Sequence, residues 1–546
     1  MMREKKILYQ FFSFLCIFAM FLYTTPCSAA WDLAGFVPFH KQKANDDSVL
    51  RIGMFTDPTI IHPLYTTHSK SVIIVNLVFS FLVRFNDKGT LEPDLATRWE
   101  VSPDGMLYTF YLRNDVYFHD GVKCTAADVK FTYDAMLNSN NKLPFSRLFS
   151  VVEKVEAVNE TTVRFYLKEK RDSFFYLIAL GILPKHLLAH TGIKDEKFIQ
   201  HPVGSGPYAF KEKKGSDLIL ERNDNYFAKE PHIKTIIFKR IANIDKQSVA
   251  LLRNEIDMAT FLPFDQFYYL KDDPYFKAYA VKSDYACVLR YDLSDPALSN
   301  IHVRQALAYG ISQQEIIDEV FKGYAQPCYG PFYPGSGGFN SHIQFFDYDP
   351  AKAAVLLEQE GYAYHDGSLY REKDGNVLEL RVVVNPAIEK GEEILKSISV
   401  QLAQVGIKVT CIRRSGTMDD FYAMLAQKKG NGINTALQPI GAGKILSDAI
   451  LDWCYYNNDS PVVYKYVNKK IETLVGKVSR TTNANERNRL WKEIHKDIYA
   501  DQPATFLIYF NQFHAINVHF GNTDAFFTLN MPTHSIGNFT IVSERG

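Results

Sequence analysis

The chain has 546 residues, of which 47% are hydrophobic, and it carries 61 basic and 61 acidic residues. This balance argues against nucleic acid or an anionic membrane surface as the main partner, because either would favour a basic protein surface. The length exceeds what one hydrophobic core normally supports and predicts two or three lobes.

The first thirty residues are typical of an export signal. "MMREKK" is basic, residues 7–23 are almost wholly apolar, and "TTPCSAA" ends in small residues. We therefore expect residues 1–30 to be removed, leaving 516 residues with a net charge near −2 in a Gram-negative periplasm. An uncleaved membrane anchor is the alternative. Lipid attachment at Cys27 is disfavoured, because Pro26 occupies the position where a lipoprotein signal requires a small residue.

The remaining chain alternates between strand and helix patterns. Short β-rich or alternating runs predict strands over residues 49–55, 106–118, 162–169 and 407–414. Apolar residues at helical spacing predict helices over residues 125–137, 303–321, 349–362 and 391–406. Thr125, followed three residues later by Asp128, predicts an N-terminal cap for the first helix. This alternation predicts the α/β class, with sheets covered by helices.

The stretch "HPVGSGPYAF" (201–210) raises the question of a phosphate-binding loop. Such a loop needs G-x-x-x-x-G-K-[ST], or G-x-G-x-x-G between a strand and a helix. Here Gly206 precedes Pro207, which has no N–H to offer a phosphate. Two β-patterned runs follow, separated by Gly215. The stretch therefore predicts the start of a β-hairpin.

Other signatures of catalysis or metal binding are also missing. The sequence contains no H-E-x-x-H and no G-x-S-x-G. His119 and Asp120 are adjacent, and neighbouring strand residues point to opposite faces, so a turn at Asp120-Gly121 explains them better than a shared metal ion. Five cysteines follow residue 30, an odd number without C-x-x-C spacing, which predicts neither a zinc site nor a disulfide framework. We therefore expect no catalytic residue, metal or cofactor.

Four segments together resemble a known family. Residues 91–137, 202–227, 300–327 and 485–510 are similar, in this order, to extracellular solute-binding proteins of family 5. These proteins are the dipeptide- and oligopeptide-binding components of ABC importers. Each phrase alone is weak, but the ordered set covers essentially the whole mature chain.

The resemblance implies a two-lobed periplasmic binding protein fold, type II-like, with an extra subdomain on the first lobe. Hinge bending between such lobes encloses a ligand. By this analogy the first lobe takes residues 48–80, 190–288 and 505–546, the extra subdomain takes 81–189, and the second lobe takes 289–504. The implied partners are a small peptide or related solute and the permease subunits of an ABC transporter. We expect a monomer that meets the membrane only through that permease.

The resemblance also suggests how the ligand is held. Peptide binders of this family carry a glycine-aromatic-x-x-aspartate segment, whose aspartate neutralises the peptide's α-amino group. Aligning "INTAL" with the family strand puts Gly443 at the aspartate position and Lys444 beside it, while Arg290 lies where oligopeptide binders carry an acidic group. Either Arg290 forms an interlobe salt bridge and Lys444 is solvated, or the cleft favours an anionic or blocked ligand.

Further ligand-binding candidates follow from the same analogy. They are His68 and Ser69 in the loop at residues 65–71, Gly441 in the segment 431–448, Tyr509 and Asn511 on the returning strand, and Phe145 as a cap. The function expected is delivery of a peptide to an ABC permease. The alternatives are a metal chelate, opine or oligosaccharide as ligand, or an exported enzyme or chaperone on the same fold.

Overall fold

The structure is a computed structural model. It describes residues 48–54, 61–66, 69–86, 90–144, 146–171, 174–365, 367–414, 416–426, 432–441, 466–481, 483–527, 536 and 538–542. The predicted signal segment and four of the predicted site residues lie outside these ranges: His68, Phe145, Gly443 and Lys444. Helices and strands both occur throughout the described part, so the α/β class is confirmed.

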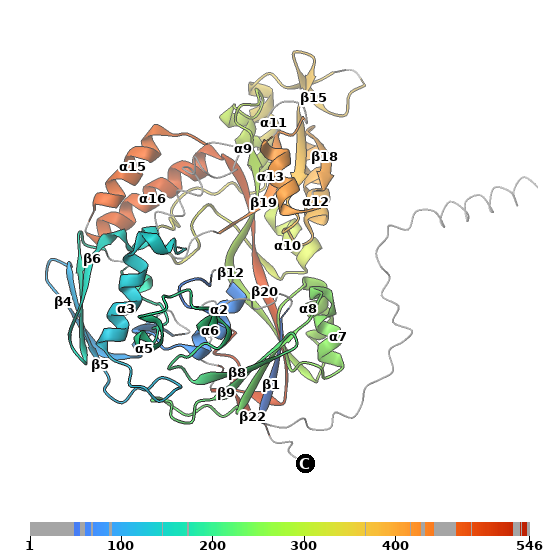
Figure 1. Cartoon of the computed structure of the whole chain (residues 1–546). Coiled ribbons are helices and arrows are strands. Elements are labelled where there is room, and N and C mark those ends of the chain that lie inside the picture. Colours follow the sequence, from blue (N-terminus) through green and yellow to red (C-terminus); the bar gives the residue numbers. More distant parts are fainter. Residues whose placement is uncertain are drawn as a thin grey trace, which may run out of the picture. The chain divides into compact units, whose positions relative to one another are not determined.

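Eleven of the described strands form one mixed sheet (Figure 1). In spatial order ten of them are β18 (Lys408–Arg414), β17 (Glu379–Val384), β19 (Thr435–Gly441), β12 (Phe276–Tyr291), β20 (Ala504–Asn517), β11 (Met258–Leu262), β1 (Val49–Met54), β10 (Thr235–Arg240), β9 (Asp217–Arg222) and β8 (Tyr208–Lys214). The eleventh, β13 (Ala325–Pro327), pairs with β20. We call β1 and β8–β11 the first half of this sheet, and β17–β19 the second half.

The long antiparallel strands β12 and β20 connect the two halves. Residues 276–282 of β12 pair with residues 511–517 of β20, and β11 of the first half pairs with β20 at the same end. Residues 286–290 of β12 pair with residues 504–509 of β20, and β19 of the second half lies against β12 there. The register shifts between Lys282 and Ala286. A joint of two strands with an irregular register is suited to hinge bending.

A separate four-stranded antiparallel sheet lies beside helix α3 (Ala126–Leu137). Its order is β4 (Ala96–Val101), β5 (Leu107–Leu112), β7 (Thr162–Leu167) and β6 (Val152–Asn159). The predicted capping box is confirmed: the Thr125 side chain accepts from the Ala127 backbone N–H, and the Asp128 carboxylate accepts from the Thr125 N–H. Buried residues of this sheet share one core with β1, β9 and β10, so it packs with the first half.

The "GSGPY" stretch does open a hairpin, formed by β8 and β9. Its glycines allow a close backbone approach. A Cβ atom on Gly204 would lie 1.9 Å from the Val78 carbonyl oxygen, and one on Gly206 would lie 2.4 Å from that of Leu77. The Gly206 N–H donates to the Val78 carbonyl at 2.9 Å. These glycines therefore serve packing against helix α2 (Ser69–Val78).

The predicted helix at residues 303–321 is wrong in one respect, because the structure divides it. Helix α9 (Ile301–Tyr309) ends at Gly310, and α10 (Gln313–Phe321) begins after Ser312, whose side chain accepts from the Glu315 N–H. A Cβ on Gly310 would lie 3.1 Å from Leu402, so the break is also tightly packed. The prediction of a strand to residue 118 was similarly too long, since β5 ends at Leu112.

The remaining elements surround these sheets. The other helices are α4 (Phe174–Leu177), α5 (Lys185–Leu188), α6 (Glu196–Gln200), α7 (Gln247–Leu252), α8 (Phe264–Leu270), α11 (Pro350–Gln359), α12 (Gly391–Gln404), α13 (Met418–Ala426), α15 (Lys469–Arg480) and α16 (Ala484–Asp501). The other strands are β2 (Val83–Phe85), β3 (Leu91–Pro93), β14 (Ala363–Tyr364), β15 (Arg371–Lys373), β16 (Asn376–Val377), β21 (Phe520–Gly521) and β22 (Thr540–Ile541). No helix in the described ranges has the length and apolar character needed to cross a membrane.

Two different cores cover opposite faces of the connecting strands. Cys287 and Phe510 belong to a core shared with α7–α12. Ala286 and Tyr509 belong to another core, which α15, α16 and the segment 328–346 complete. Neighbouring strand residues thus alternate between the two cores. The four cysteines described, Cys124, Cys287, Cys328 and Cys411, are free.

Candidate functional site

Strand pairing brings three of the predicted site residues to one zone, at the register shift of β12. Gly441 pairs with Tyr285, Tyr509 pairs with Ala286, and Asn511 pairs with Lys282. The two halves of the sheet meet here, so any bending between the halves changes the surroundings of these residues. We call the zone formed by residues 282–286, 441 and 509–511 the junction.

Tyr509 is the best fixed of these residues. It is 1% exposed, its hydroxyl donates to the Phe332 carbonyl at 3.1 Å, and its ring centroid lies 5.2 Å from that of Tyr333. Burial raises the pKa of its hydroxyl well above the usual value. Tyr509 therefore belongs to the packed core at the junction. Asn511 is half-buried, and its side-chain oxygen accepts from Gln326 at 3.3 Å.

Arg290 lies farther along β12, opposite Ala436 on one side and Ala504 on the other. It lies four positions from Ala286, which is about 13 Å along a strand. The residue is only 9% exposed, and the two alanines leave room for its long side chain. A buried guanidinium requires acceptor groups around it, because an unpaired buried charge is costly. Arg290 is thus a buried charged residue of β12, about 13 Å along the strand from Ala286.

Ser69 is the first residue of α2. Strand pairing does not carry it into the junction, since α2 packs near β8 in the first half. The roles of Ser69, Arg290, Gly441, Tyr509 and Asn511 as ligand contacts remain predictions.

Two residues at the centre of the junction, Ser283 and Tyr285, were not predicted from the sequence. The Ser283 hydroxyl donates to the Phe510 carbonyl at 2.7 Å and accepts from the Tyr285 N–H at 3.2 Å, so it bridges the register shift. Tyr285 is 38% exposed, and partial burial raises the pKa of its hydroxyl to about 12. The available signal was the polar run Lys282-Ser283-Asp284 in the middle of a largely apolar strand.

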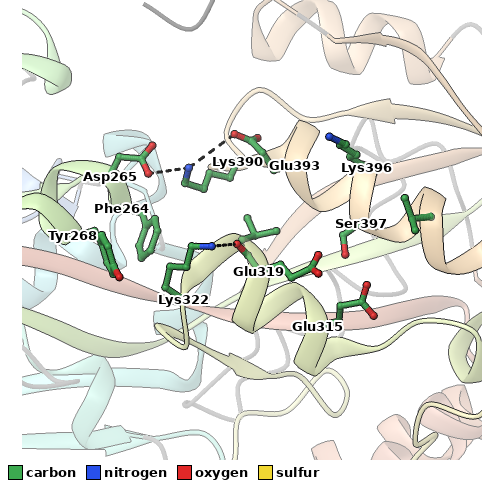
Figure 2. A pocket seen from close by; sticks show the side chains of 12 residues that line it. Phe264, Asp265, Tyr268, Glu315, Glu319, Lys322, Lys390, Glu393, Lys396 and Ser397 are labelled. Carbon is green, nitrogen blue, oxygen red and sulfur yellow. Dashed lines mark hydrogen bonds and ion pairs between the residues drawn. The ribbon is translucent and has the colours of Figure 1, made fainter. Parts of the chain in front are cut away.

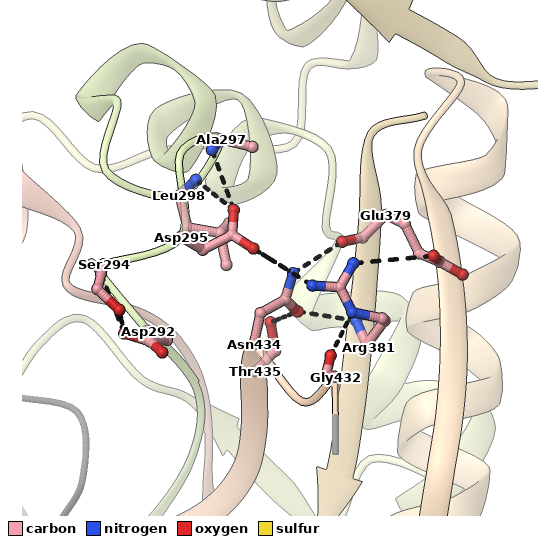
Figure 3. A network of polar contacts seen from close by, with 10 residues as sticks. All are labelled: Asp292, Ser294, Asp295, Ala297, Leu298, Glu379, Arg381, Gly432, Asn434 and Thr435. Carbon is pink, nitrogen blue, oxygen red and sulfur yellow. Dashed lines mark hydrogen bonds and ion pairs between the residues drawn. The ribbon is translucent and has the colours of Figure 1, made fainter. Parts of the chain in front are cut away.

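A polar network fixes the second half at the far end of β12 (Figure 3). Asp295 accepts from the Asn434 amide at 2.9 Å and from the Arg381 guanidinium at 3.4 Å. The Asn434 side-chain oxygen in turn accepts from the Arg381 backbone N–H at 2.8 Å. The network joins β17, the start of β19 and the loop after β12. It therefore fixes the start of β19 against β17 and the loop after β12.

The adjacent residues His119 and Asp120 contact different partners. The His119 ring lies between the Gly204 N–H and the Gly206 carbonyl, and burial lowers its pKa to about 4. Asp120 contacts His186 at 2.7 Å, and Gly121 has a φ of +85°, so the predicted turn is confirmed. Within the described residues no group of three or more histidine, cysteine or acidic side chains is placed to hold a metal ion.

Comparison with known proteins identifies the family. Residues 90–461 match the model for "Bacterial extracellular solute-binding proteins, family 5 Middle". The chain belongs to this family. The predicted resemblance is therefore confirmed. Members of family 5 are periplasmic or extracellular proteins that bind solutes for ABC importers, and they are binding proteins rather than enzymes.

Individual relatives of this family 5 protein span nearly its whole length. It is 27% identical over 528 residues to the oligopeptide-binding protein AppA of Bacillus subtilis (strain 168), covering 93% of this chain and 94% of AppA. It is 29% identical over 479 residues to the glutathione-binding protein GsiB of Pectobacterium atrosepticum, with coverage of 85% and 88%. Among solved structures, NikZ from Campylobacter jejuni in complex with Ni(L-His) is 26% identical, with a TM-score of 0.72 over 87% of this chain and 95% of NikZ.

Proposed function

We propose that this solute-binding protein captures a peptide-like ligand at the junction and delivers it to an ABC permease from the periplasm. The observation that carries the proposal is the pairing of β12 and β20, which join the two halves at an irregular register. Such a joint allows the halves to close on a ligand and hide it from water. The names of AppA and GsiB, which bind an oligopeptide and glutathione, support a ligand with peptide bonds.

The proposed contacts come from both sides of the junction. Tyr285 supplies an exposed aromatic face, which gives contact area at a low entropic cost. Asn511 supplies an amide that can both donate to and accept from a peptide backbone. By analogy with the family, we assign the first and second halves of the sheet to two lobes with the boundaries predicted from the sequence. Residues 81–189 would then form an extra subdomain.

We further propose that the ligand is anionic or lacks a free amino terminus. Arg290 supports this, because the family resemblance places it where oligopeptide binders carry an acidic group. Gly443 and Lys444, which the family resemblance aligns with an amine-binding position, support it from the sequence. A positive potential repels the ammonium group of a free peptide and favours carboxylates or acetylated ends.

Two experiments test the proposal. Native mass spectrometry of protein purified from its own periplasm should show a co-purified solute, which leaves chemically unchanged on denaturation. A thermal-shift titration with one tripeptide library, in N-acetylated and free-amine forms, should show larger stabilisation by the acetylated form, because ligand binding stabilises the folded state by mass action. A clear preference for free amines would reject the anionic or blocked ligand, and a hydrolysed solute would reject the binding function itself.

A metal chelate is the second candidate ligand. It is favoured by the similarity to NikZ, whose structure holds Ni(L-His). Elemental analysis of the freshly purified protein distinguishes the two, because a chelate brings about one metal atom per chain and a peptide brings none.

A further inference from the structure

A groove lies on the face of the connecting strands opposite to Tyr509. Helices α8, α10 and α12 enclose it, with a volume of about 490 Å³ (Figure 2). Helix α8 follows β11 of the first half, whereas α12 lies between β17 and β18 of the second half. The walls of the groove therefore belong to both halves, and its width depends on the angle between them.

Two consecutive residues of the second half hold the start of α8. The Glu389 carboxylate accepts a hydrogen bond from the Phe264 backbone N–H, and Lys390 Nζ lies 2.9 Å from Asp265 Oδ1. Helix α8 begins after Pro263, which gives no side-chain cap, so Glu389 supplies the acceptor that the helix start lacks. We call Glu389, Lys390, Phe264 and Asp265 the rear bridge.

Packing shows that the rear bridge is on the far side of the connecting strands. The ring centroids of Phe264 and Phe513 are 5.5 Å apart, and Phe321 of α10 lies 5.7 Å from Phe510. Tyr509 packs instead on Tyr333, in the core that covers the other face. A rotation about the register shift that brings the halves together at the Tyr509 face must therefore separate α8 from α12 at the rear.

We propose that the rear bridge opposes closure and so sets ligand affinity without touching the ligand. Glu389 and Lys390 are positioning residues in this account, which rests on the proposed function. Every contact between the halves that must break on closure favours the open arrangement. Because the protein must close to bind its ligand, each such contact lowers the apparent affinity for that ligand. Weakening the bridge should strengthen binding.

The size of the effect follows from the exposure of the ion pair. The Lys390 side chain is 17% exposed and that of Asp265 is 73% exposed, so their interaction is that of a partly solvated pair. Breaking such a pair changes an equilibrium constant by up to about fivefold. Lys390→Ala should therefore lower the Kd for ligand by up to about fivefold.

The decisive readout is a variant that loses an ion pair and binds more tightly. The probe is the best-binding N-acetylated tripeptide of the library used above, titrated by isothermal calorimetry into wild type, Lys390→Ala and Asp265→Asn. Lys470→Ala is the matched control, because it breaks the exposed Lys470–Asp497 pair of 2.8 Å between α15 and α16. Tighter binding by both bridge variants, with the control unchanged, is expected. Equal or weaker binding by Lys390→Ala would overturn the proposal.

A second readout needs no ligand. Val400 on α12 lines the groove and is 55% exposed, so Val400→Trp should wedge the rear walls apart. Small-angle X-ray scattering of the unliganded double variant Lys390→Ala/Val400→Trp should give a smaller radius of gyration than wild type. Val355→Trp, at a similarly exposed site on α11 outside the groove lining, should give none of this change. An unchanged radius of gyration in the double variant would contradict the rear-bridge proposal, even if no peptide binds. If the radius is reduced but no peptide binds, only the proposed ligand class is contradicted.

Discussion

Replacing Gly204 with alanine tests whether this glycine is needed for close packing. The backbone φ of Gly204 is not positive, so an alanine meets no conformational barrier there. Its Cβ atom, however, would lie 1.9 Å from the Val78 carbonyl oxygen and 2.7 Å from the carbonyl carbon. Backbone atoms cannot turn aside as a flexible side chain can. The segment before β8 and the end of α2 must therefore move apart by more than about 1 Å.

The cost can be worked from the contacts that this movement breaks. The Gly206 N–H donates to the Val78 carbonyl at 2.9 Å, and the His119 N–H donates to the Gly204 carbonyl at 2.8 Å. Losing two hydrogen bonds costs about 2 kcal/mol, and overpacking adds about 1–3 kcal/mol. Gly204→Ala should therefore lower the free energy of unfolding by about 3–5 kcal/mol.

Urea unfolding followed by circular dichroism measures this loss. Gly476→Ala is the control, because Gly476 lies within helix α15 and a Cβ there meets nothing within 4 Å. That change should raise stability by up to about 1 kcal/mol, since alanine favours a helix. If Gly204→Ala unfolds at the urea concentration of wild type, the close approach to Val78 is not a constraint and the packing account of this stretch is wrong.

Three further changes test other parts of the structure. Arg304 is 6% exposed and donates to four backbone carbonyls of the α9 and β20 regions. Arg304→Met should therefore lower the free energy of unfolding, measured in urea, by about 3–5 kcal/mol. A loss below about 1 kcal/mol would show that those carbonyls have other hydrogen-bond donors. Thr125→Ala should cost about 1 kcal/mol by removing the capping box of α3, and no change would mean that packing alone sets this helix start. Burial raises the pKa of Glu389 to about 7. Between about pH 4.5 and 7 the folded chain therefore keeps a proton that the unfolded chain releases. The contribution of Glu389 to the free energy of unfolding consequently falls as the pH rises through this range. Glu389→Gln should remove that slope from a series of unfolding curves, and an unchanged slope would contradict the burial of this carboxyl.

Local sequence patterns predicted much of the fold. The alternating run at residues 162–169 and the Thr125–Asp128 cap were informative because strand and helix-start signals are set by nearby residues. The break between α9 and α10 was missed, because apolar spacing continues across Gly310 and the packing of Leu402 against it comes from a distant helix. Pairing of β12 with β20 joins segments more than 200 residues apart, which no local pattern reports.

The candidate site was less predictable than the fold. The family resemblance pointed to Tyr509 and Asn511, which strand pairing brings near Gly441 at the junction. It could not show that the Tyr509 hydroxyl donates a hydrogen bond to the Phe332 carbonyl. An aromatic residue in a strand can pack in a core or contact a ligand equally well. Glu389 and Lys390 carry no motif at all, and only the three-dimensional arrangement places them beside α8.

The central claim is that two halves of one sheet close around a solute. Small-angle X-ray scattering of the purified protein, loaded with its co-purified solute and again after the solute is removed, tests this claim most directly. Closure requires a smaller radius of gyration for the loaded protein, restored to the larger value on removal and reduced again when the released solute is added back. The same radius in both states would contradict closure about the junction.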